Sequence, residues 1–165
     1  MSGKDEEILG VWSELFVGSA FAVRAVESRM AGKAPLSVDE YDVMLCISRS
    51  PDQSIRFSAL AEAATYTKSG ITRIMKRLQA EGFVVRKECP DDRRGSLAEL
   101  TAEGRKALKD TWRHYRTAIL ETLSPSFTAQ EAKTLRELLG RIVDEFSTPA
   151  LVQIRSPKLV RPPGL

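Results

Sequence analysis

The stretch from Thr67 to Gln79 contains hydroxyl and cationic side chains but no carboxylate. Stepped at about 100° per residue, it forms a helix with one apolar side and one polar side. The apolar side is made of Ile71, Ile74, Met75 and Leu78, and the polar side of Lys68, Ser69, Thr72, Arg73, Lys76 and Arg77. Hydroxyls and cations without carboxylates suit the acceptor-rich major groove of DNA and its flanking phosphates. The segment is therefore predicted to be a DNA-reading helix, the alternative being a solvated helix face.

Within this polar side, Arg73 is the predicted base reader, because a guanidinium can donate to O6 and N7 of one guanine. Lys76 and Arg77 are better suited to phosphates, which set the register of a protein on the duplex. Gly70 has no Cβ, which predicts a close approach of the preceding helix or of the DNA backbone. The remaining predicted DNA contacts are Ser58, Thr67, Lys68, Ser69 and Thr72.

A β-hairpin is predicted directly after this helix. Phe83 to Glu88 and Ser96 to Leu100 have strand character, and the polar loop from Cys89 to Gly95 joins them. Arg93 and Arg94 at its tip are predicted DNA contacts, because an arginine there can enter the electronegative minor groove. Asp92 is predicted to stabilise this wing by pairing with Arg94, which leaves Arg93 free; a mobile charged turn is the alternative.

The distribution of charge also favours this region as a phosphate-binding surface. The chain has 165 residues and a net charge of +3. Between Thr65 and Arg94, eight Lys and Arg residues face four Asp and Glu residues, a net +4, so the other 135 residues sum to −1. All the net positive charge therefore lies in one short segment.

The elements that must position these residues are mostly helices. Glu6 to Met30 is predicted to be a long amphipathic helix, and a capping box at Ser37 to Glu40 opens a second one. A short extended piece spans Ile55 to Phe57, after which Ser58 is expected to cap a third helix. The helix capped by Thr67 should end near Ala80, with Gly82 just beyond.

Two more helices are predicted after the hairpin. One begins at Thr101 and reaches Leu123, and a capping box from Thr128 to Glu131 opens the last, which carries apolar residues to Phe146. The fold class is therefore mainly α with a small β-hairpin: a winged helix-turn-helix core flanked by long dimerisation helices. The predicted division is 1–34 as an N-terminal dimerisation helix, 35–100 as the DNA-binding domain, 101–146 as C-terminal dimerisation helices and 147–165 as a basic, proline-containing tail.

From about Leu36 to Leu108 the sequence resembles the MarR (multiple antibiotic resistance regulator) family. The matching residues are Leu36 to Tyr41; Leu60, Ala61, Thr67, Ser69, Gly70, Thr72, Arg73, Leu78 and Gly82 to Val84; and Asp92 to Arg94 with Leu100 to Gly104. The resemblance implies an obligate dimer, held by the first and the last two helices, with its recognition helices in successive major grooves. It also implies a pocket for a small molecule, often a phenolic or aromatic acid, between the dimerisation and DNA-binding parts.

Candidates for that pocket are aromatic residues, one histidine and one methionine. They are Trp12, Phe16, Met44, His114 and Tyr115. The alternative is that these side chains simply form the core of a dimer. Because His114 is the only histidine, a histidine metal cluster within one chain is excluded, and no metal or cofactor is expected.

The two cysteines are expected to differ. Cys89, placed at the base of the wing among cationic residues, is a candidate redox thiol, although an incidental surface thiol is the alternative. Cys46, between Leu45 and Ile47, is expected to be a small buried hydrophobe. Neither forms a metal-spaced pair or a disulfide framework, which indicates a reducing cytoplasm.

These patterns predict a homodimeric transcription regulator, expected to be a repressor, on a palindromic DNA site with half-sites about one helical turn apart. The alternatives are a winged-helix dimer for protein–protein assembly and a thiol-based redox sensor. Enzymatic activity is not expected, because no phosphate-binding glycine loop, nucleophile elbow or H-E-x-x-H motif is present. No membrane span is expected, since no apolar run approaches about 18 residues and the polar start is no signal peptide.

Overall fold

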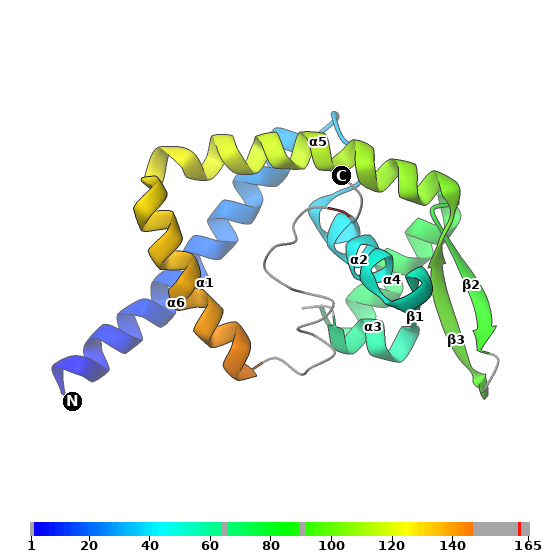
Figure 1. Ribbon diagram of the computed structural model, residues 1–165, viewed down its shortest axis with the longest axis horizontal. Coiled ribbons are helices and arrows are strands. Elements are labelled where there is room, and N and C mark those ends of the chain that lie inside the picture. Colours follow the sequence, from blue (N-terminus) through cyan, green and yellow to red (C-terminus); the bar gives the residue numbers. More distant parts are fainter. Residues whose placement is uncertain (1, 64–65, 90–91, 147–161, 163–165) are drawn as a thin grey trace.

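The computed structural model describes residues 2–63, 66–89, 92–146 and 162, of which the side chains of 62, 63 and 92–95 are not described. A long helix, α5, runs along one edge of the molecule, with α1 and α6 at one end and the remaining elements at the other (Figure 1). The elements are α1 (Gly3–Met30), α2 (Val38–Arg49), η1 (Pro51–Gln53), β1 (Ser54–Arg56), α3 (Phe57–Ala63), α4 (Lys68–Ala80), β2 (Val84–Cys89), β3 (Asp92–Leu100), α5 (Ala102–Leu123), η2 (Ser124–Ser126) and α6 (Ala129–Phe146). The predicted fold class is confirmed.

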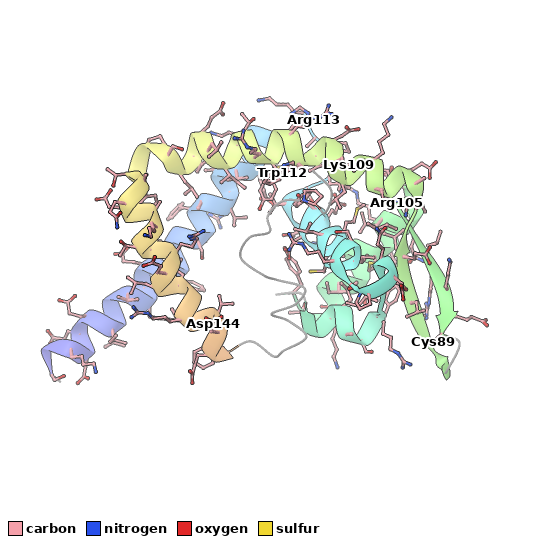
Figure 2. The ribbon with its side chains drawn as sticks, in the orientation of Figure 1. Cys89, Arg105, Lys109, Trp112, Arg113 and Asp144 are labelled. Atoms are coloured by element: carbon pink, nitrogen blue, oxygen red, sulfur yellow. The ribbon has the colours of Figure 1, made fainter. Side chains whose placement is uncertain are left out.

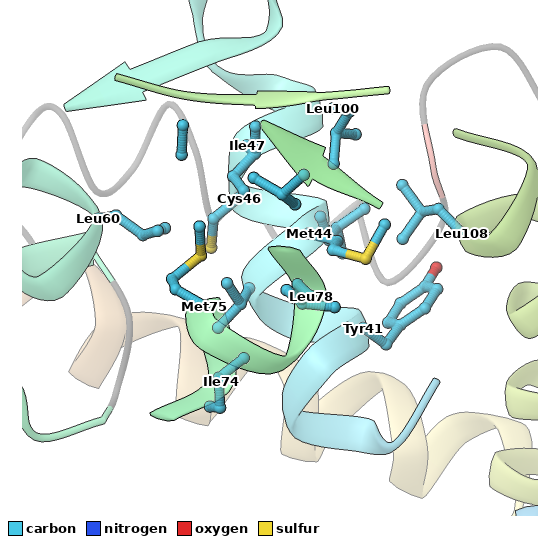
Figure 3. Close-up of a cluster of buried hydrophobic side chains, with 14 of the residues drawn as sticks. Tyr41, Met44, Cys46, Ile47, Leu60, Ile74, Met75, Leu78, Leu100 and Leu108 are labelled. Carbon is cyan, nitrogen blue, oxygen red and sulfur yellow. The ribbon is translucent and has the colours of Figure 1, made fainter. Parts of the chain in front are cut away.

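The main core surrounds α2, which contacts α3, α4, α5 and the sheet. Because α2 is covered from several directions, eight of its twelve residues are buried. Its side chains meet those of the neighbouring elements in one apolar cluster (Figure 3). The largest fully buried members are Tyr41, Met44, Ile47, Leu60, Met75, Leu78 and Leu100. This core fixes α4 and the base of the hairpin relative to α2.

The sheet has three antiparallel strands in the order β1-β3-β2. The short piece β1 pairs with β3, Ser54 opposite Glu99, so it extends the predicted hairpin into a sheet. Strand pairing in the hairpin runs from Val84–Leu100 to Cys89–Asp92. The loop predicted over residues 89–95 is therefore too long, because cross-strand pairing continues almost to the tip.

The third helix begins two residues earlier than the sequence pattern indicates, at Phe57 rather than Ala59. Phe57 is its first residue, so Ser58 lies inside the first turn and the prediction that Ser58 caps this helix was wrong. Phe57 packs against the main core, and the Arg86 guanidinium lies 5.3 Å from the centre of its ring. The aromatic residue that follows β1 is thus held by the core at the point where the helix begins.

The outer helices leave apolar side chains uncovered. Only Val26 and Met30 of α1 are buried, in a small cluster with Val38 and Ala118, and α6 buries no residue. The apolar residues exposed on α1 are Ile8, Leu9, Val11, Trp12, Phe16, Val17, Phe21 and Val23. Between α5 and α6 lies an apolar groove of about 630 Å³ that includes Leu123, Phe127 and Leu139.

An 18-residue window within α1 has a mean hydropathy of 1.4. By length and composition alone this helix could cross a membrane, so the expectation that no apolar run approaches that length was wrong. The helices of soluble proteins that associate through apolar faces can reach the same hydropathy, because burial against protein also selects apolar residues.

Candidate nucleic-acid interface

The helix α4 forms where the sequence predicts it. Thr67 is its N-cap, and its Oγ1 accepts a hydrogen bond of 3.1 Å from the Gly70 amide. The helix ends at Ala80, and Gly82 follows in the left-handed region with φ of +73°, which glycine adopts without steric cost. These local signals set both ends of the helix.

The two sides of α4 differ in burial as predicted. Ile71, Ile74, Met75 and Leu78 are buried in the main core. The polar side is exposed throughout, at Lys68, Ser69, Thr72, Arg73, Lys76 and Arg77. The six side chains predicted to face DNA therefore share one open surface, here called the reading face.

Three members of the reading face have no intramolecular ion pair within the described residues, namely Lys68, Arg73 and Lys76. The hydroxyls are partly engaged. Thr72 Oγ1 donates to the Lys68 carbonyl at 2.8 Å, and the hydroxyls of Thr67 and Ser69 lie 3.1 Å apart. Thr72 can therefore still accept a hydrogen bond, and the three cations remain available to an external anion.

Arg77 has an ion pair that the sequence did not reveal. Its Nε lies 3.0 Å from Oε1 of Glu40, whose side chain is only 5% exposed. The other carboxylate oxygen of Glu40 accepts from the Ser37 amide at 2.9 Å, completing the capping box of α2. The capping-box pattern predicted the contact of Glu40 with Ser37. Nothing in the local sequence indicates the contact of Glu40 with Arg77, which lies 37 residues further along the chain.

Gly70 lies at the start of the reading face. A Cβ built there would lie 3.3 Å from Thr67 Oγ1 and 3.7 Å from Tyr66 Cβ. The nearest neighbours of the added Cβ therefore belong to the capping turn and not to the preceding helix. The other predicted reason for Gly70, a close approach of the DNA backbone, stays a prediction.

The predicted wing contacts lie outside the described side chains. Asp92, Arg93 and Arg94 begin β3, but their side chains, and with them the predicted Asp92–Arg94 pair, are not described. Cys89 ends β2 opposite Asp92, beside the tip of the hairpin (Figure 2). Its predicted position at the base of the wing, and its interpretation as a surface thiol, were both wrong, because it is only 6% exposed. Cys46 is buried, as predicted.

The five residues predicted to line a ligand pocket do not come together within one chain. Trp12 and Phe16 stack on each other at 6.4 Å on α1, and each is 68% exposed. Met44 is fully buried in the main core, and His114 is exposed on α5. Tyr115 instead meets Tyr41 edge-on, with 4.9 Å between ring centres. Within one protomer Met44 and Tyr115 belong to the main core or pack against it, and the other three residues are exposed, so the pocket stays a prediction for the assembled dimer.

The Tyr41–Tyr115 contact, joined by Trp112, fills the interface between α2 and α5. Burial raises the pKa of Tyr41 well above its ordinary value near 10, and it also raises the pKa of Tyr115. These phenols are therefore neutral parts of the core at physiological pH.

An exposed cationic helix packed by its apolar side onto a core helix, followed by a hairpin, defines a winged helix-turn-helix DNA-binding protein. Residues 36–96 match the model of the MarR family. An uncharacterized HTH-type transcriptional regulator of Bacillus cereus is 30% identical over 107 residues, covering 65% of this chain and 69% of that protein. This chain belongs to the MarR family and is a DNA-binding transcription regulator.

Two further relatives extend this comparison. The HTH-type transcriptional repressor YetL of Bacillus subtilis (strain 168) is 27% identical over 141 residues, 84% of each chain. The crystal structure of Sco3205, a MarR family transcriptional regulator from Streptomyces coelicolor in complex with DNA, superposes with a TM-score of 0.73. That superposition covers 90% of this chain and 92% of Sco3205 at 23% identity, so it supports the fold. The family and these relatives are transcription regulators rather than enzymes.

Proposed function

We propose that this protein is a transcriptional repressor that binds a palindromic operator as a homodimer. The observation that carries the proposal is the reading face, which is exposed over its whole length and contains no carboxylate. Arg73 reads a base edge, while Lys68 and Lys76 contact phosphates. Repression is inferred from the likeness to YetL, a repressor that matches 84% of this chain.

The proposed homodimer is supported by the uncovered apolar surface of the outer helices. Trp12, Phe16 and Phe21 on α1 are each more than 60% exposed. Together with the groove between α5 and α6, they form more apolar surface than monomers usually leave in water. A second copy that covers them makes residues 1–34 and 101–146 the dimerisation parts and leaves 35–100 to contact DNA.

The test is selection of duplexes from a random pool, followed by affinity measurements at several salt concentrations. The selected sites should be inverted repeats with centres about one helical turn apart. Arg73→Ala should weaken binding to the selected site by about 1–3 kcal/mol and relax the base preference at one position. Lys76→Ala should weaken binding to all sequences alike and lower the slope of log K against log salt concentration by about 1 for each half-site.

The matched control is Lys133→Ala, an exposed cation on α6 that should leave base preference unchanged. A pool that shows no enrichment, with the same affinity for every sequence, would refute sequence-specific binding. Sedimentation of the free protein as a monomer at micromolar concentration would refute the dimer. Assembly without DNA binding, the main alternative, would also require an acidic partner for the reading face.

We further propose that a small aromatic acid releases the DNA. A pocket of about 270 Å³, just below the range of about 300–1,000 Å³ usual for small-molecule sites, lies between the end of α1 and the start of α2, and Arg77 of α4 lines it. A carboxylate there would compete with Glu40 for Arg77. Salicylate and benzoate should each raise the melting temperature of the protein in a thermal-shift assay. They should also lower its affinity for the operator, and the absence of both effects would refute release by these acids.

A thiol switch is the weaker regulatory hypothesis, because Cys89 and Cys46 are both buried. Peroxide treatment should therefore leave operator affinity unchanged.

A further inference from the structure

We propose that the outer surface of α5 binds the backbone of a second DNA duplex, so that one operator-bound dimer can bridge two DNA segments. The surface consists of five cations, here called the basic face: Arg105, Lys106, Lys109, Arg113 and Arg116. The inference goes beyond the proposed function, because operator binding uses α4 and does not need this surface.

The five cations share one side of the helix. At 100° per residue they fall within an arc of about 100°, over a rise of about 16 Å. All five are exposed, and no ion pair engages them within the described residues. The three acids of α5, at Glu103, Asp110 and Glu121, fall outside that arc. The helix thus separates its charges and concentrates the positive ones on one side.

The basic face lacks the apolar anchors of a protein interface. No large exposed apolar side chain occurs between Arg105 and Arg116, and the first on α5 is Leu120. Protein interfaces are centred on buried aromatic and apolar groups and are depleted in lysine. A phosphate backbone needs cations, because binding is driven by release of its counterions. The composition of this face therefore favours a nucleic acid over a protein partner.

Polar groups at one end of the basic face add to its fit for phosphate. Arg105, Lys106 and Lys109 line a cavity of about 390 Å³ together with the polar residues Ser48 and Gln53, and its other lining residues are Ala102, Leu108 and Pro162. The Arg105 guanidinium also donates to the Leu100 carbonyl at 2.8 Å, which fixes its orientation while leaving other N–H groups free. Amide, ammonium and guanidinium donors of this kind are common contacts to DNA phosphates.

The basic face and the reading face point away from each other. The buried side of α5, with Ala107, Leu108 and Thr111, lies opposite the basic face on the helix. That side packs on α2, and α2 also contacts α4. Arg105, Lys109 and Arg113 follow one another along α5 at the edge of the molecule opposite α3 (Figures 1 and 2). One straight duplex on α4 therefore cannot reach them, and a second duplex can.

The experiment uses the selected operator duplex, immobilised and saturated with the dimer, and measures capture of a labelled 30-base-pair duplex of unrelated sequence. The variant is Lys106→Gln/Lys109→Gln/Arg113→Gln, which spares Arg105 and removes three exposed cations. The control is Lys33→Gln/Lys133→Gln/Arg141→Gln, which removes the same charge from exposed positions elsewhere. Affinity for the operator itself is measured separately by anisotropy.

We expect the α5 variant to bind the second duplex at least tenfold more weakly. The slope of log K against log salt concentration should fall in magnitude by about 2 to 3, because three phosphate contacts are removed. The control should change second-duplex affinity less than twofold, and both variants should bind the operator within about threefold of the unmodified protein. If the α5 variant and the control capture the second duplex equally well, the inference is wrong.

Two further outcomes also overturn the inference. One is operator binding by the unmodified protein without any capture of a second duplex at 50 mM salt. The other is capture of phosphatidylglycerol–phosphatidylcholine vesicles in place of the duplex, which would assign the basic face to a lipid surface. Failure of operator binding itself would instead refute the proposed function, so the two failures are distinguishable.

Discussion

Replacing Gly104 by alanine should destabilise the junction between the wing and α5. A Cβ at this position would lie 2.0 Å from the carbonyl oxygen of Phe83 and 2.9 Å from its carbonyl carbon. Both atoms belong to the backbone, so no change of rotamer relieves the clash. The Thr101 amide donates to this same carbonyl at 3.0 Å, and the Thr101 hydroxyl donates to the Gly82 carbonyl at 2.7 Å.

The magnitude follows from the shift that the methyl group requires. Real Cβ contacts are rarely below 3.0 Å, so the two backbone segments must separate by roughly 1 Å, which lengthens both Thr101 hydrogen bonds. Loss of these bonds costs about 1 kcal/mol each, and overpacking adds about 1–3 kcal/mol. Alanine is more favourable than glycine within a helix, which offsets about 1 kcal/mol of this cost. We expect a net loss of about 2–4 kcal/mol, a fall in melting temperature of about 4–16 °C for a chain of this size.

Urea unfolding followed by circular dichroism measures this loss. The control is Gly10→Ala, since Gly10 also lies within a helix but has no atom within 4 Å of the added methyl group. The control should be as stable as the unmodified protein or slightly more stable. If Gly104→Ala unfolds at the same urea concentration as the control, the junction is not the rigid contact argued above.

Two further predictions concern charged and ionisable groups in the same lobe. Glu40→Gln keeps an acceptor for the Ser37 amide but removes the ion pair with Arg77, so it should cost about 1 kcal/mol or less in urea unfolding. Arg77→Gln should cost more than Glu40→Gln, because it leaves a buried carboxylate without its cation; equal costs would show that the pair is not coupled. Burial raises the pKa of Tyr41 above its ordinary value near 10, so the unfolded state ionises first, and stability is retained below about pH 10 and falls as pH rises further. Tyr41→Phe should flatten the fall in melting temperature between pH 9 and 11, and an unchanged slope would contradict this cause.

The sequence predicts those features that depend on neighbours within one or two helical turns. Ser37, Thr67, Thr101 and Thr128 were all expected at helix starts, and each accepts a hydrogen bond from a backbone amide in the first turn of its helix. The division of α4 into a buried and an exposed side was likewise predictable, because its apolar residues recur with the helical period of 3.6 residues.

Features set by distant contacts were not predictable in this way. At the start of α3, Phe57 contacts the core and the Arg86 guanidinium. Local sequence does not indicate these contacts, and the capping propensity of Ser58 led to a predicted start that was wrong. The burial of Cys89 depends on the register of β2 against β3. The aromatic residues on α1 and α5 have the composition of a pocket, but packing directs Tyr115 into the core and leaves Trp12 exposed.

Arg77 shows how such a contact changes the meaning of a local pattern. From the sequence, Lys76 and Arg77 are equivalent cations at the edge of the reading face. In the structure, Glu40 engages Arg77 and leaves Lys76 free. A phosphate that binds Arg77 must therefore share its guanidinium with a buried carboxylate that also caps α2, whereas a phosphate that binds Lys76 displaces only water and counterions. Two adjacent cations thus differ in how they contribute to DNA affinity, and the difference comes from a residue on another helix.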